Sequence, residues 1–241
     1  MTFKEMGLKP ELQRALERIG FIQPTPIQSQ VIPMILENPQ DIVGLAQTGT
    51  GKTAAFGLPL LHLIDLKRKT PQGLVIAPTR ELCIQISNDI RNFASDMSDF
   101  YLEPVYGGAN IVSQIKSIRK GVQVIVATPG RLVDLIKRGA VDLSEVEIVV
   151  LDEADEMLNM GFKEDLDTIL DQTPKEKKTW LFSATMPQEV LRISRQYMSD
   201  PVEVQVGNRN SGAENIQHIY FIIRERDRYL ALKRMVDYYP E

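Results

Sequence analysis

The sequence predicts an α/β fold, with a mostly parallel β-sheet that is covered by helices on both faces. Short runs rich in β-branched and apolar residues recur along the chain, and longer segments with helical spacing separate them. Strands that are apolar on both sides are typical of parallel sheets, because the connecting helices cover both faces. The expected strands span residues 42–45, 74–77, 122–127, 148–151, 180–182 and 202–206.

The segments between these runs have the length and spacing of helices and end near prolines. The clearest helices are expected over residues 52–69, 80–97 and 163–170, with breaks at Pro71, Pro104 and Pro174. Right-handed crossovers place the carboxyl ends of parallel strands along one edge of the sheet, and ligands of open α/β sheets bind there. We therefore expect the functional residues in the loops that follow the strands.

Composition narrows the class of protein. The chain has 241 residues, 28 Lys and Arg against 32 Asp and Glu, and a single cysteine. Cys83 has no partner for an internal disulfide, and no segment approaches the ~18 apolar residues that span a bilayer. We expect a cytoplasmic, monomeric protein that does not cross a membrane. A net charge of -4 excludes nucleic-acid binding through bulk basicity, so any such contact must be local.

The chain is long enough for one large domain and a piece of another. Residues 207–214, GNRNSGAE, are small and polar and predict a linker. A strand-like run over 216–223 and a helical segment over 227–238 follow it. We expect a complete domain over 1–206 and the start of a second domain over 215–241. Alternatively, these last residues are a strand and a helix docked on the first domain.

A glycine-rich segment follows the first expected strand and opens a helix, as a phosphate-binding loop does. Gly49 and Gly51 allow the tight turn that points backbone N–H groups and a helix N-terminus at phosphates. Lys52 would reach the β and γ phosphates, and the Thr53 hydroxyl would bind Mg²⁺. The loop residues expected to bind nucleotide are Ala46, Gln47, Thr48, Gly49, Thr50, Gly51, Lys52 and Thr53.

Two carboxylates follow the strand expected over 148–151. Asp152 would hold Mg²⁺ through water, and Glu153 would orient and deprotonate the water that attacks the γ phosphate. Acidic residues also begin helices, so this pattern gains weight only beside the phosphate loop. The sequence has no Asn-Lys-x-Asp run that reads guanine and no Leu-Ser-Gly-Gly-Gln stretch. Together these patterns predict a nucleoside triphosphatase that hydrolyses its substrate.

With the phosphate loop and the tetrad DEAD at 152–155, the sequence resembles the DEAD-box RNA helicases. Five further segments match motifs of that family in order: 20–28 (GFIQPTPIQ), 78–82 (PTREL), 107–108 (GG), 128–131 (TPGR) and 183–185 (SAT). The resemblance covers residue 3 to about residue 206. It implies a RecA-like P-loop NTPase domain that binds ATP and Mg²⁺, in an ATP-dependent RNA helicase.

The resemblance also implies roles for residues near the N-terminus. Phe3, Phe21, Gln23 and Gln28 would bind adenine, since the Gln28 amide can donate to and accept from the base edge and Phe3 can stack on the ring. Thr25 has two interpretations: a contact with the phosphate loop, or a helix N-cap before Pro26.

RNA contacts are implied at seven positions. Their hydroxyls, glycine N–H groups and arginines can bind phosphate and ribose oxygens without reading base edges, so binding would be largely independent of RNA sequence. The helix that begins at Gly130 would bend the RNA strand. For Arg80 the alternative is a surface salt bridge with Glu81 or Asp89. The positions are Thr79, Arg80, Gly107, Gly108, Thr128, Gly130 and Arg131.

Residues 183–185 would couple the nucleotide state to RNA. We expect Ser183 or Thr185 to bond with Asp155, and the alternative is a hydroxyl cap on a helix that begins at 186 or 187. The family's phosphate-stabilising arginines belong to a second domain that this chain lacks, so the chain alone should hydrolyse ATP slowly. Two other functions remain: a non-catalytic module that binds adenine nucleotides or a protein partner, and a DNA translocase.

Overall fold

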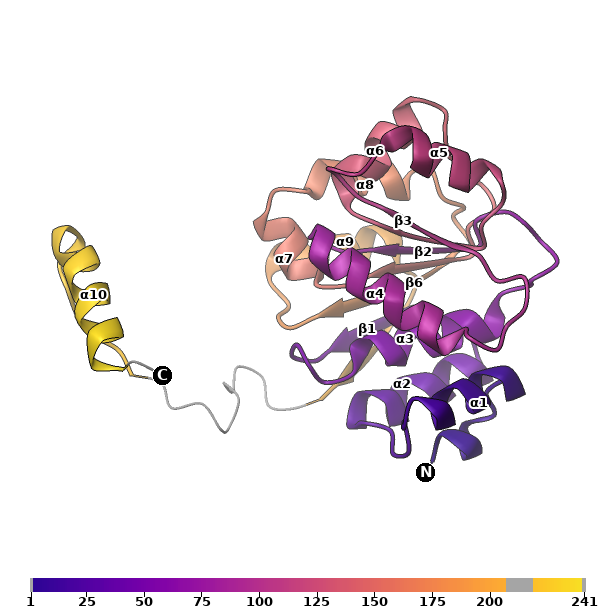
Figure 1. Cartoon of the computed structure of the whole chain (residues 1–241), viewed down its shortest axis with the longest axis horizontal. Coiled ribbons are helices and arrows are strands. Elements are labelled where there is room, and N and C mark those ends of the chain that lie inside the picture. Colours follow the sequence, from indigo (N-terminus) through magenta and orange to yellow (C-terminus); the bar gives the residue numbers. More distant parts are fainter. Residues whose placement is uncertain (1, 207–218, 240–241) are drawn as a thin grey trace. The chain divides into compact units, whose positions relative to one another are not determined.

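The computed structural model describes residues 2–206 and 219–239 of the chain. It divides the chain into two compact units, residues 1–207 and residues 208–241, and each is described by itself (Figure 1). The linker expected over residues 207–214 lies outside the described residues.

A seven-stranded sheet forms the centre of the first unit, and all of its strand pairs are parallel. The strand order is β3-β4-β2-β5-β6-β1-β7, and each strand is connected to the next one in sequence through one or two helices (Figure 1). The α/β prediction is confirmed, and the six expected strands are all present. The strands are β1 (Ile42–Leu45), β2 (Gly73–Ile76), β3 (Leu102–Val105), β4 (Val124–Ala127), β5 (Ile148–Leu151), β6 (Lys178–Ser183) and β7 (Val202–Gln205).

Helices cover both faces of this sheet. On one face, α1 to α4 bury a core cluster that includes Trp180, a residue that is fully buried. On the other face, α5 to α9 bury a second cluster that includes Leu132. Successive strand side chains point to opposite faces, so Val150 joins the first cluster and Leu151 the second. The helices are α1 (Pro10–Arg18), α2 (Pro26–Glu37), α3 (Lys52–Leu63), α4 (Arg80–Phe93), α5 (Ile111–Arg119), α6 (Pro129–Lys137), α7 (Ala154–Asn159), α8 (Lys163–Leu170) and α9 (Gln188–Tyr197), with a short 3₁₀ helix η1 (Phe3–Met6) at the start.

Strand β3 was not expected, because the sequence predicted a break at Pro104. In the structure Pro104 lies inside the strand. The strand occupies one edge of the sheet and pairs only with β4. A proline lacks the N–H that a central strand would need, but an edge strand can leave one side of its backbone unpaired. The break prediction at Pro104 was therefore wrong.

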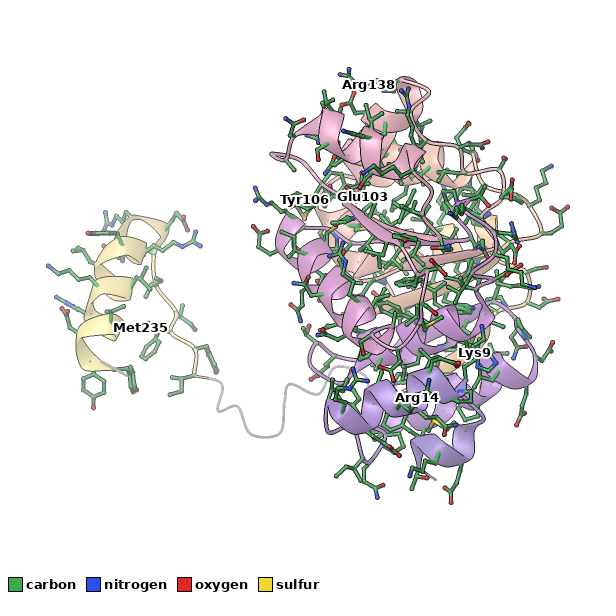
Figure 2. All side chains as sticks on the ribbon, turned by 45° about the vertical axis from the view of Figure 1, so that its right-hand side comes forward. Lys9, Arg14, Glu103, Tyr106, Arg138 and Met235 are labelled. Carbon is green, nitrogen blue, oxygen red and sulfur yellow. The ribbon has the colours of Figure 1, made fainter. Side chains whose placement is uncertain are left out.

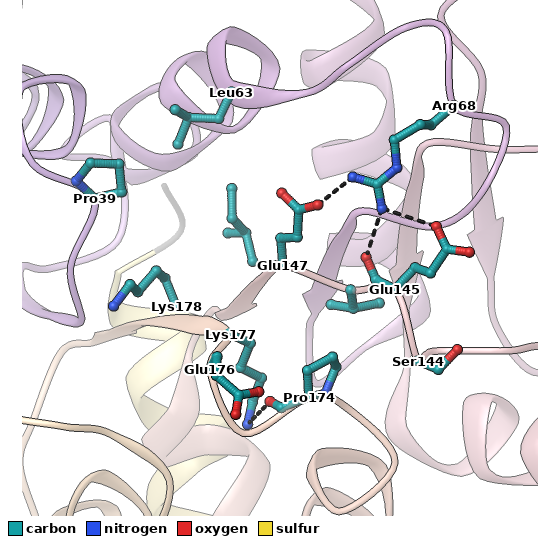
Figure 3. Close-up of a pocket in the computed structure, with 12 residues that line it drawn as sticks. Pro39, Leu63, Arg68, Ser144, Glu145, Glu147, Pro174, Glu176, Lys177 and Lys178 are labelled. Atoms are coloured by element: carbon teal, nitrogen blue, oxygen red, sulfur yellow. Dashed lines mark hydrogen bonds and ion pairs between the residues drawn. The ribbon is translucent and has the colours of Figure 1, made fainter.

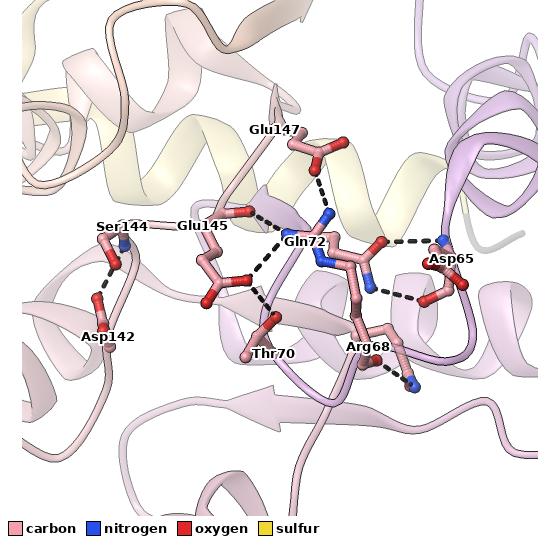
Figure 4. A network of polar contacts seen from close by, with 9 residues as sticks. Asp65, Arg68, Thr70, Gln72, Asp142, Ser144, Glu145 and Glu147 are labelled. Atoms are coloured by element: carbon pink, nitrogen blue, oxygen red, sulfur yellow. Dashed lines mark hydrogen bonds and ion pairs between the residues drawn. The ribbon is translucent and has the colours of Figure 1, made fainter.

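Helices α3 and α4 end earlier than expected, at Leu63 and Phe93. After α3, the Gln72 side chain binds both backbone groups of Asp65: it accepts from the amide at 2.9 Å and donates to the carbonyl at 2.8 Å (Figure 4). A side chain that binds these backbone groups offers them an alternative to helical hydrogen bonds. The loop that leads to β2 therefore begins directly after α3.

The second unit contains a 3₁₀ helix, η2 (Glu225–Asp227), and α10 (Arg228–Tyr238). This confirms the helix that was expected over 227–238. The strand expected over 216–223 is absent from its described part, residues 219–223, and the rest of that range lies outside the described residues. Residues 219–223 pair with no strand in the described parts of the chain. No helix in the described ranges is both long and apolar enough to cross a membrane.

Candidate functional site

The strand order separates two groups of motifs along the carboxyl edge of the sheet. The phosphate loop, the acidic tetrad and residues 183–185 follow β1, β5 and β6, which are adjacent in the sheet. The motifs that resemble RNA contacts follow β2, β3 and β4, which form the other half. The two halves meet where β2 pairs with β5. One edge of the sheet therefore carries both groups of motifs, side by side.

The phosphate loop connects β1 to α3 and surrounds a buried ammonium group. Gly49 and Gly51 both have positive φ, 80° and 91°, which supports the tight turn that was expected. Lys52 is only 6% exposed, and its Nζ lies 3.9 Å from Asp152 Oδ1. This Nζ is buried without a hydrogen-bond partner. Asp152 is thus its ion-pair partner but lies beyond hydrogen-bond distance, and phosphate oxygens would supply the acceptors that this buried ammonium lacks.

The two acidic residues differ in their surroundings. Asp152 is 3% exposed at the end of β5, and burial raises its pKa to about 6, although the charge of Lys52 opposes this shift. Glu153 has a φ of 52° and a ψ of 51°, in the left-handed region that residues other than glycine rarely adopt. Such backbone strain is concentrated at functional sites. Both side chains line one pocket together with Lys52 and the phosphate loop.

That pocket has a volume of about 410 Å³, within the range of small-molecule sites. Eight of the residues expected to bind ATP or Mg²⁺ line it together with the expected base Glu153, and these nine come from three separate parts of the chain. The remaining nucleotide-binding predictions, Phe3, Gln23, Ala46, Gln47 and Thr50, do not line the pocket. The nine lining residues are Phe21, Gln28, Thr48, Gly49, Gly51, Lys52, Thr53, Asp152 and Glu153.

Gln28 bonds to the phosphate loop in this structure. Its Nε2 donates to Gly51 O at 3.0 Å, and its Oε1 accepts from Thr25 N at 2.9 Å. A Cβ at Gly51 would displace Gln28 Nε2, and the φ of 91° would strain the backbone of any other residue there. The Thr25 hydroxyl is buried at the N-cap of α2 without a hydrogen-bond partner, 3.1 Å from where that Cβ would be. Both interpretations of Thr25 are thus consistent with its position, and Gln28 connects the adenine motif to the loop.

Of the two phenylalanines expected to bind adenine, Phe21 lines the pocket and Phe3 does not. Phe3 is 4% exposed and belongs to the core, whereas Phe21 is 37% exposed and lines the pocket. The ring of Phe21 lies between Phe3 and Phe93, with centroid distances of 6.1 Å and 5.8 Å. In this structure the Phe3 ring thus packs against Phe21 in the core and does not line the pocket, and its stacking on adenine stays a prediction.

One wall of the pocket was missed by the sequence analysis. Leu82, Gln85, Asp89 and Asn92 of α4 line it and are spaced three or four residues apart, so they share one face of the helix. Burial raises the pKa of the half-buried Asp89 carboxyl group. The helical spacing after the 78–82 motif was the signal that could have identified this wall.

The donor set at the pocket suits Mg²⁺. In the described parts of the chain, no group of three or more His, Cys, Asp or Glu side chains is arranged to hold a metal ion. Mg²⁺ is commonly bound by one or two protein oxygens, with waters and substrate phosphates as its other ligands. Thr53 and Asp152, both on the pocket wall, are of the types required.

Asp155 bonds to both hydroxyl residues that were expected beside it. Thr185 Oγ1 and Thr185 N donate to Asp155 Oδ2 at 2.6 Å and 3.0 Å, and Asp155 N donates to Ser183 Oγ at 3.3 Å. Burial raises the pKa of Asp155, but hydrogen bonds that include those from Thr185 outweigh it and lower the pKa below its usual value. The N-cap of α9 is Pro187, so neither hydroxyl residue occupies that position.

Arg80 makes no salt bridge with Glu81 or Asp89, and it has no ion pair with any other described residue. Instead its guanidinium lies 5.0 Å from the centroid of the Tyr106 ring. Gly108 has a φ of 82°, and a Cβ there would be 3.1 Å from Arg80 Nη1. The structure thus brings together the motifs at 78–82 and 107–108.

The other predicted RNA contacts begin helices at the same edge. Thr79 caps α4, where its Oγ1 accepts from Leu82 N at 3.2 Å, and Thr128 is the N-cap of α6. Arg131, in the first turn of α6, donates to Ala109 O at 3.2 Å. Gly107, Gly108 and Gly130 are exposed.

A second hollow, of about 470 Å³, lies at the opposite edge, where β5 and β6 begin (Figure 3). Four of its charged side chains have partners in the protein: Arg68 forms ion pairs with Glu145 and Glu147, and Lys177 Nζ donates to Pro174 O at 3.3 Å (Figure 3). None of the sequence motifs reaches it. The candidate site is therefore the pocket at the carboxyl edge.

Comparison with known proteins agrees with this geometry. A family model described as DEAD/DEAH box helicase matches residues 25–193. The chain belongs to the DEAD/DEAH box helicase family. The matched range includes the phosphate loop, the acidic tetrad and residues 183–185. This membership agrees with the RecA-like fold and the parallel sheet described above.

Individual members of the family match nearly the whole chain. The DEAD-box ATP-dependent RNA helicase CshA of Geobacillus kaustophilus is 47% identical over 236 residues, which are 98% of this chain and 50% of that protein. CshA of Bacillus subtilis is 46% identical over 237 residues, 98% of this chain and 48% of that protein. The crystal structure of a DEAD box protein from Methanococcus jannaschii has a TM-score of 0.83 and 39% identity, and the match covers 98% of this chain and 63% of that one. This chain thus spans about half the length of the two CshA proteins.

Proposed function

We propose that the protein is a DEAD-box ATP-dependent RNA helicase, in which ATP hydrolysis stimulated by RNA drives local unwinding of short duplexes. One observation supports this most directly. The buried ammonium of Lys52 lacks a hydrogen-bond partner and faces Asp152, in a pocket that also contains Glu153. The same sheet edge presents Arg80 and Arg131, neither of which has an ion pair among the described residues.

For hydrolysis, the residues of this pocket would divide the work. Lys52 would bind the β and γ phosphates as a point charge, and α3 would direct its N-terminal N–H groups at them. Thr53 and Asp152 would hold Mg²⁺, which would neutralise charge on the phosphates. Glu153 would accept a proton from the attacking water. Phe21 and Gln28 would bind the adenine, once Gln28 exchanges its bond with Gly51 for the base.

For RNA, the second half of the edge offers backbone contacts. Arg80 and Arg131 would bind phosphates, and the hydroxyls of Thr79 and Thr128 would bind phosphate or ribose oxygens. Gly130 would let the RNA backbone approach the start of α6. Such contacts read no bases, so the protein would bind RNA largely independently of its sequence. The hydrogen bonds of Asp155 with Thr185 and Ser183 lie in the other half of the edge and would couple the nucleotide state of the pocket to RNA.

A second domain would complete the enzyme. We propose that residues 1–206 form the ATP-binding domain, that 207–214 link it to a second RecA-like domain, and that 215–241 begin that domain. Because arginines of a second domain can accelerate phosphoryl transfer by roughly three to five orders of magnitude, this chain alone should turn over slowly. We further propose that the protein acts as a cytoplasmic monomer. The single cysteine, Cys83, is buried, and burial raises the pKa of its thiol to about 12, so the thiolate that disulfide formation requires is disfavoured.

The test compares ATP binding and ATPase activity for this chain and for the longer protein that contains it, each with single-stranded RNA, with DNA of the same sequence, and without nucleic acid. We expect RNA, but not DNA, to stimulate the ATPase activity of the longer protein. We expect little ATP turnover from this chain under any of these conditions. Lys52→Ala should weaken ATP binding, whereas Glu153→Gln should preserve binding and reduce turnover about 10²- to 10⁴-fold. Equal stimulation by DNA would favour a translocase. ATP binding without turnover in the longer protein would favour a non-catalytic module.

A further inference from the structure

Arg80 and Arg131, two of the residues predicted to bind RNA, are both contacted by one short segment of the chain, residues 106–114. Tyr106 follows β3, and its ring lies 5.0 Å from the Arg80 guanidinium. Figure 2 shows Tyr106 at the β3 side of the first unit, beside α4. Eight residues later in the chain, Gln114 of α5 accepts a hydrogen bond at 2.8 Å from Arg131 Nη1. Neither Tyr106 nor Gln114 belongs to the motifs that sequence analysis assigned to RNA.

Gln114 connects the two contacts. Its side chain is 4% exposed, and its Nε2 donates to Tyr106 O and to Pro104 O, both at 3.3 Å. Its Oε1 accepts from Arg131, whose Nη1 also donates to Ala109 O at 3.2 Å. One buried amide thus fixes the backbone that carries the Tyr106 ring and also orients the guanidinium of Arg131. The donors and the acceptor of this amide all have partners, as a buried polar side chain requires.

The groups that contact Arg80 and Arg131 are uncharged, so the positive charges of both arginines remain available to bind phosphate. Arg80 is held by an aromatic ring, and Arg131 by an amide oxygen and a backbone carbonyl, all of which are uncharged. Neither arginine forms an ion pair within the described ranges. An arginine held by a carboxylate would have to break that pair before it could bind a phosphate. An arginine held by neutral groups is ordered in advance and keeps its charge.

We propose that Tyr106 and Gln114 are positioning residues of the RNA site, which fix Arg80 and Arg131 for phosphate binding before RNA arrives. This inference rests on the proposed RNA-binding function. It gives Tyr106 and Gln114 a role through the arginines and not through direct contact with RNA. Because ordering a long side chain on binding costs affinity, an arginine that is already in place binds more tightly.

The test measures the affinity of the longer protein for a fluorescent single-stranded oligouridylate, with a non-hydrolysable ATP analogue present. Tyr106→Leu should raise the Kd for RNA about two- to fivefold, the effect of losing an exposed cation–π contact. Tyr106→Phe keeps the ring and should bind like the wild type. In an Arg80→Ala background, Tyr106→Leu should have no further effect, because the arginine that it positions is gone.

Gln114→Met provides an independent test of the proposal, because it keeps the length of the side chain but removes its hydrogen bonds. It should raise the Kd about tenfold, and much less in an Arg131→Ala background. ATP affinity without RNA and the melting temperature show whether each variant is folded, and if Gln114→Met is unfolded, the Tyr106 variants decide the test alone.

The possible outcomes distinguish a failure of the positioning role from a failure of the proposed RNA-binding function. If Arg80→Ala weakens RNA binding and Tyr106→Leu does not, the positioning role is wrong and the RNA-binding function stands. An equal loss from Tyr106→Leu in the Arg80→Ala background would show that Tyr106 contacts RNA itself, and would also overturn the positioning role. If the wild type does not bind RNA, the proposed function fails.

Discussion

The hydroxyl of Thr185 donates a 2.6 Å hydrogen bond to Asp155 Oδ2, and the Thr185 amide donates to the same oxygen at 3.0 Å. Asp155 lies in the first turn of α7, three residues after the buried Asp152 at the ATP pocket. Thr185 follows β6 and is exposed. This pair therefore ties the acidic tetrad, whose first two residues line the pocket, to an exposed segment after β6.

We predict that Thr185→Val weakens the coupling of ATP hydrolysis to RNA unwinding. The substitution removes the 2.6 Å bond but keeps the shape of the side chain and the backbone bond. The number of ATP molecules hydrolysed per duplex unwound by the longer protein should rise, with ATP affinity unchanged. Thr168→Val is the matched control, because the Thr168 hydroxyl only donates to the Glu164 carbonyl of its own helix. An unchanged ratio in Thr185→Val would argue against a coupling role.

The two aromatic residues of the adenine motif should behave oppositely when truncated. Phe21→Ala should weaken ATP binding with little loss of stability, because its ring is 37% exposed at the pocket. Phe3→Ala should lower the free energy of unfolding by about 3 kcal/mol, because its ring is buried in the core. Isothermal titration with ATP and urea unfolding measure the two effects. A larger loss of ATP affinity in Phe3→Ala than in Phe21→Ala, in folded proteins, would restore the stacking role that the sequence implied for Phe3.

The strands and the phosphate loop could be predicted from sequence because each is encoded locally. Four consecutive apolar residues at Ile148–Leu151 indicate a buried strand, and glycines at fixed spacing indicate the loop. Strand β3 escaped prediction because its proline is acceptable only at a sheet edge, and edge position is a property of the assembled sheet.

The contacts of the site depend on the tertiary structure in the same way. Arg80 and Tyr106 are far apart in sequence, and only the packing of α4 beside β3 brings the ring to the guanidinium. Likewise, whether Phe3 or Phe21 faces the pocket depends on how the N-terminal helices pack, which a residue pattern does not specify. The sequence therefore predicted which motifs share an edge, and the structure shows which side chains within them meet.

His62 makes the stability of the fold depend on pH, and its surroundings determine the direction of that dependence. Its Nδ1 accepts from the backbone amide of Lys9 at 3.2 Å, which is possible only for a neutral acceptor nitrogen. Burial lowers the pKa of His62, and the charge of Lys9 lowers it further. The unfolded chain, with a histidine pKa of about 6.5, therefore takes up a proton at a higher pH than the folded chain does. The stability that this group contributes is fully present above pH ~6.5 and is lost as pH falls from there through the lower folded pKa.

We therefore predict that the free energy of unfolding of the wild type, measured by urea titration, falls relative to that of His62→Gln between pH 7 and pH 5.5. His62→Gln keeps a side-chain acceptor but cannot take up a proton. The raised pKa of the Asp152 carboxyl stabilises the folded state as pH falls through the same range, but it acts equally in both proteins. The ionisable groups other than His62 are the same in both proteins, which makes the difference between their pH profiles the contribution of His62. Parallel profiles for the wild type and His62→Gln would show that the imidazole does not govern this pH dependence.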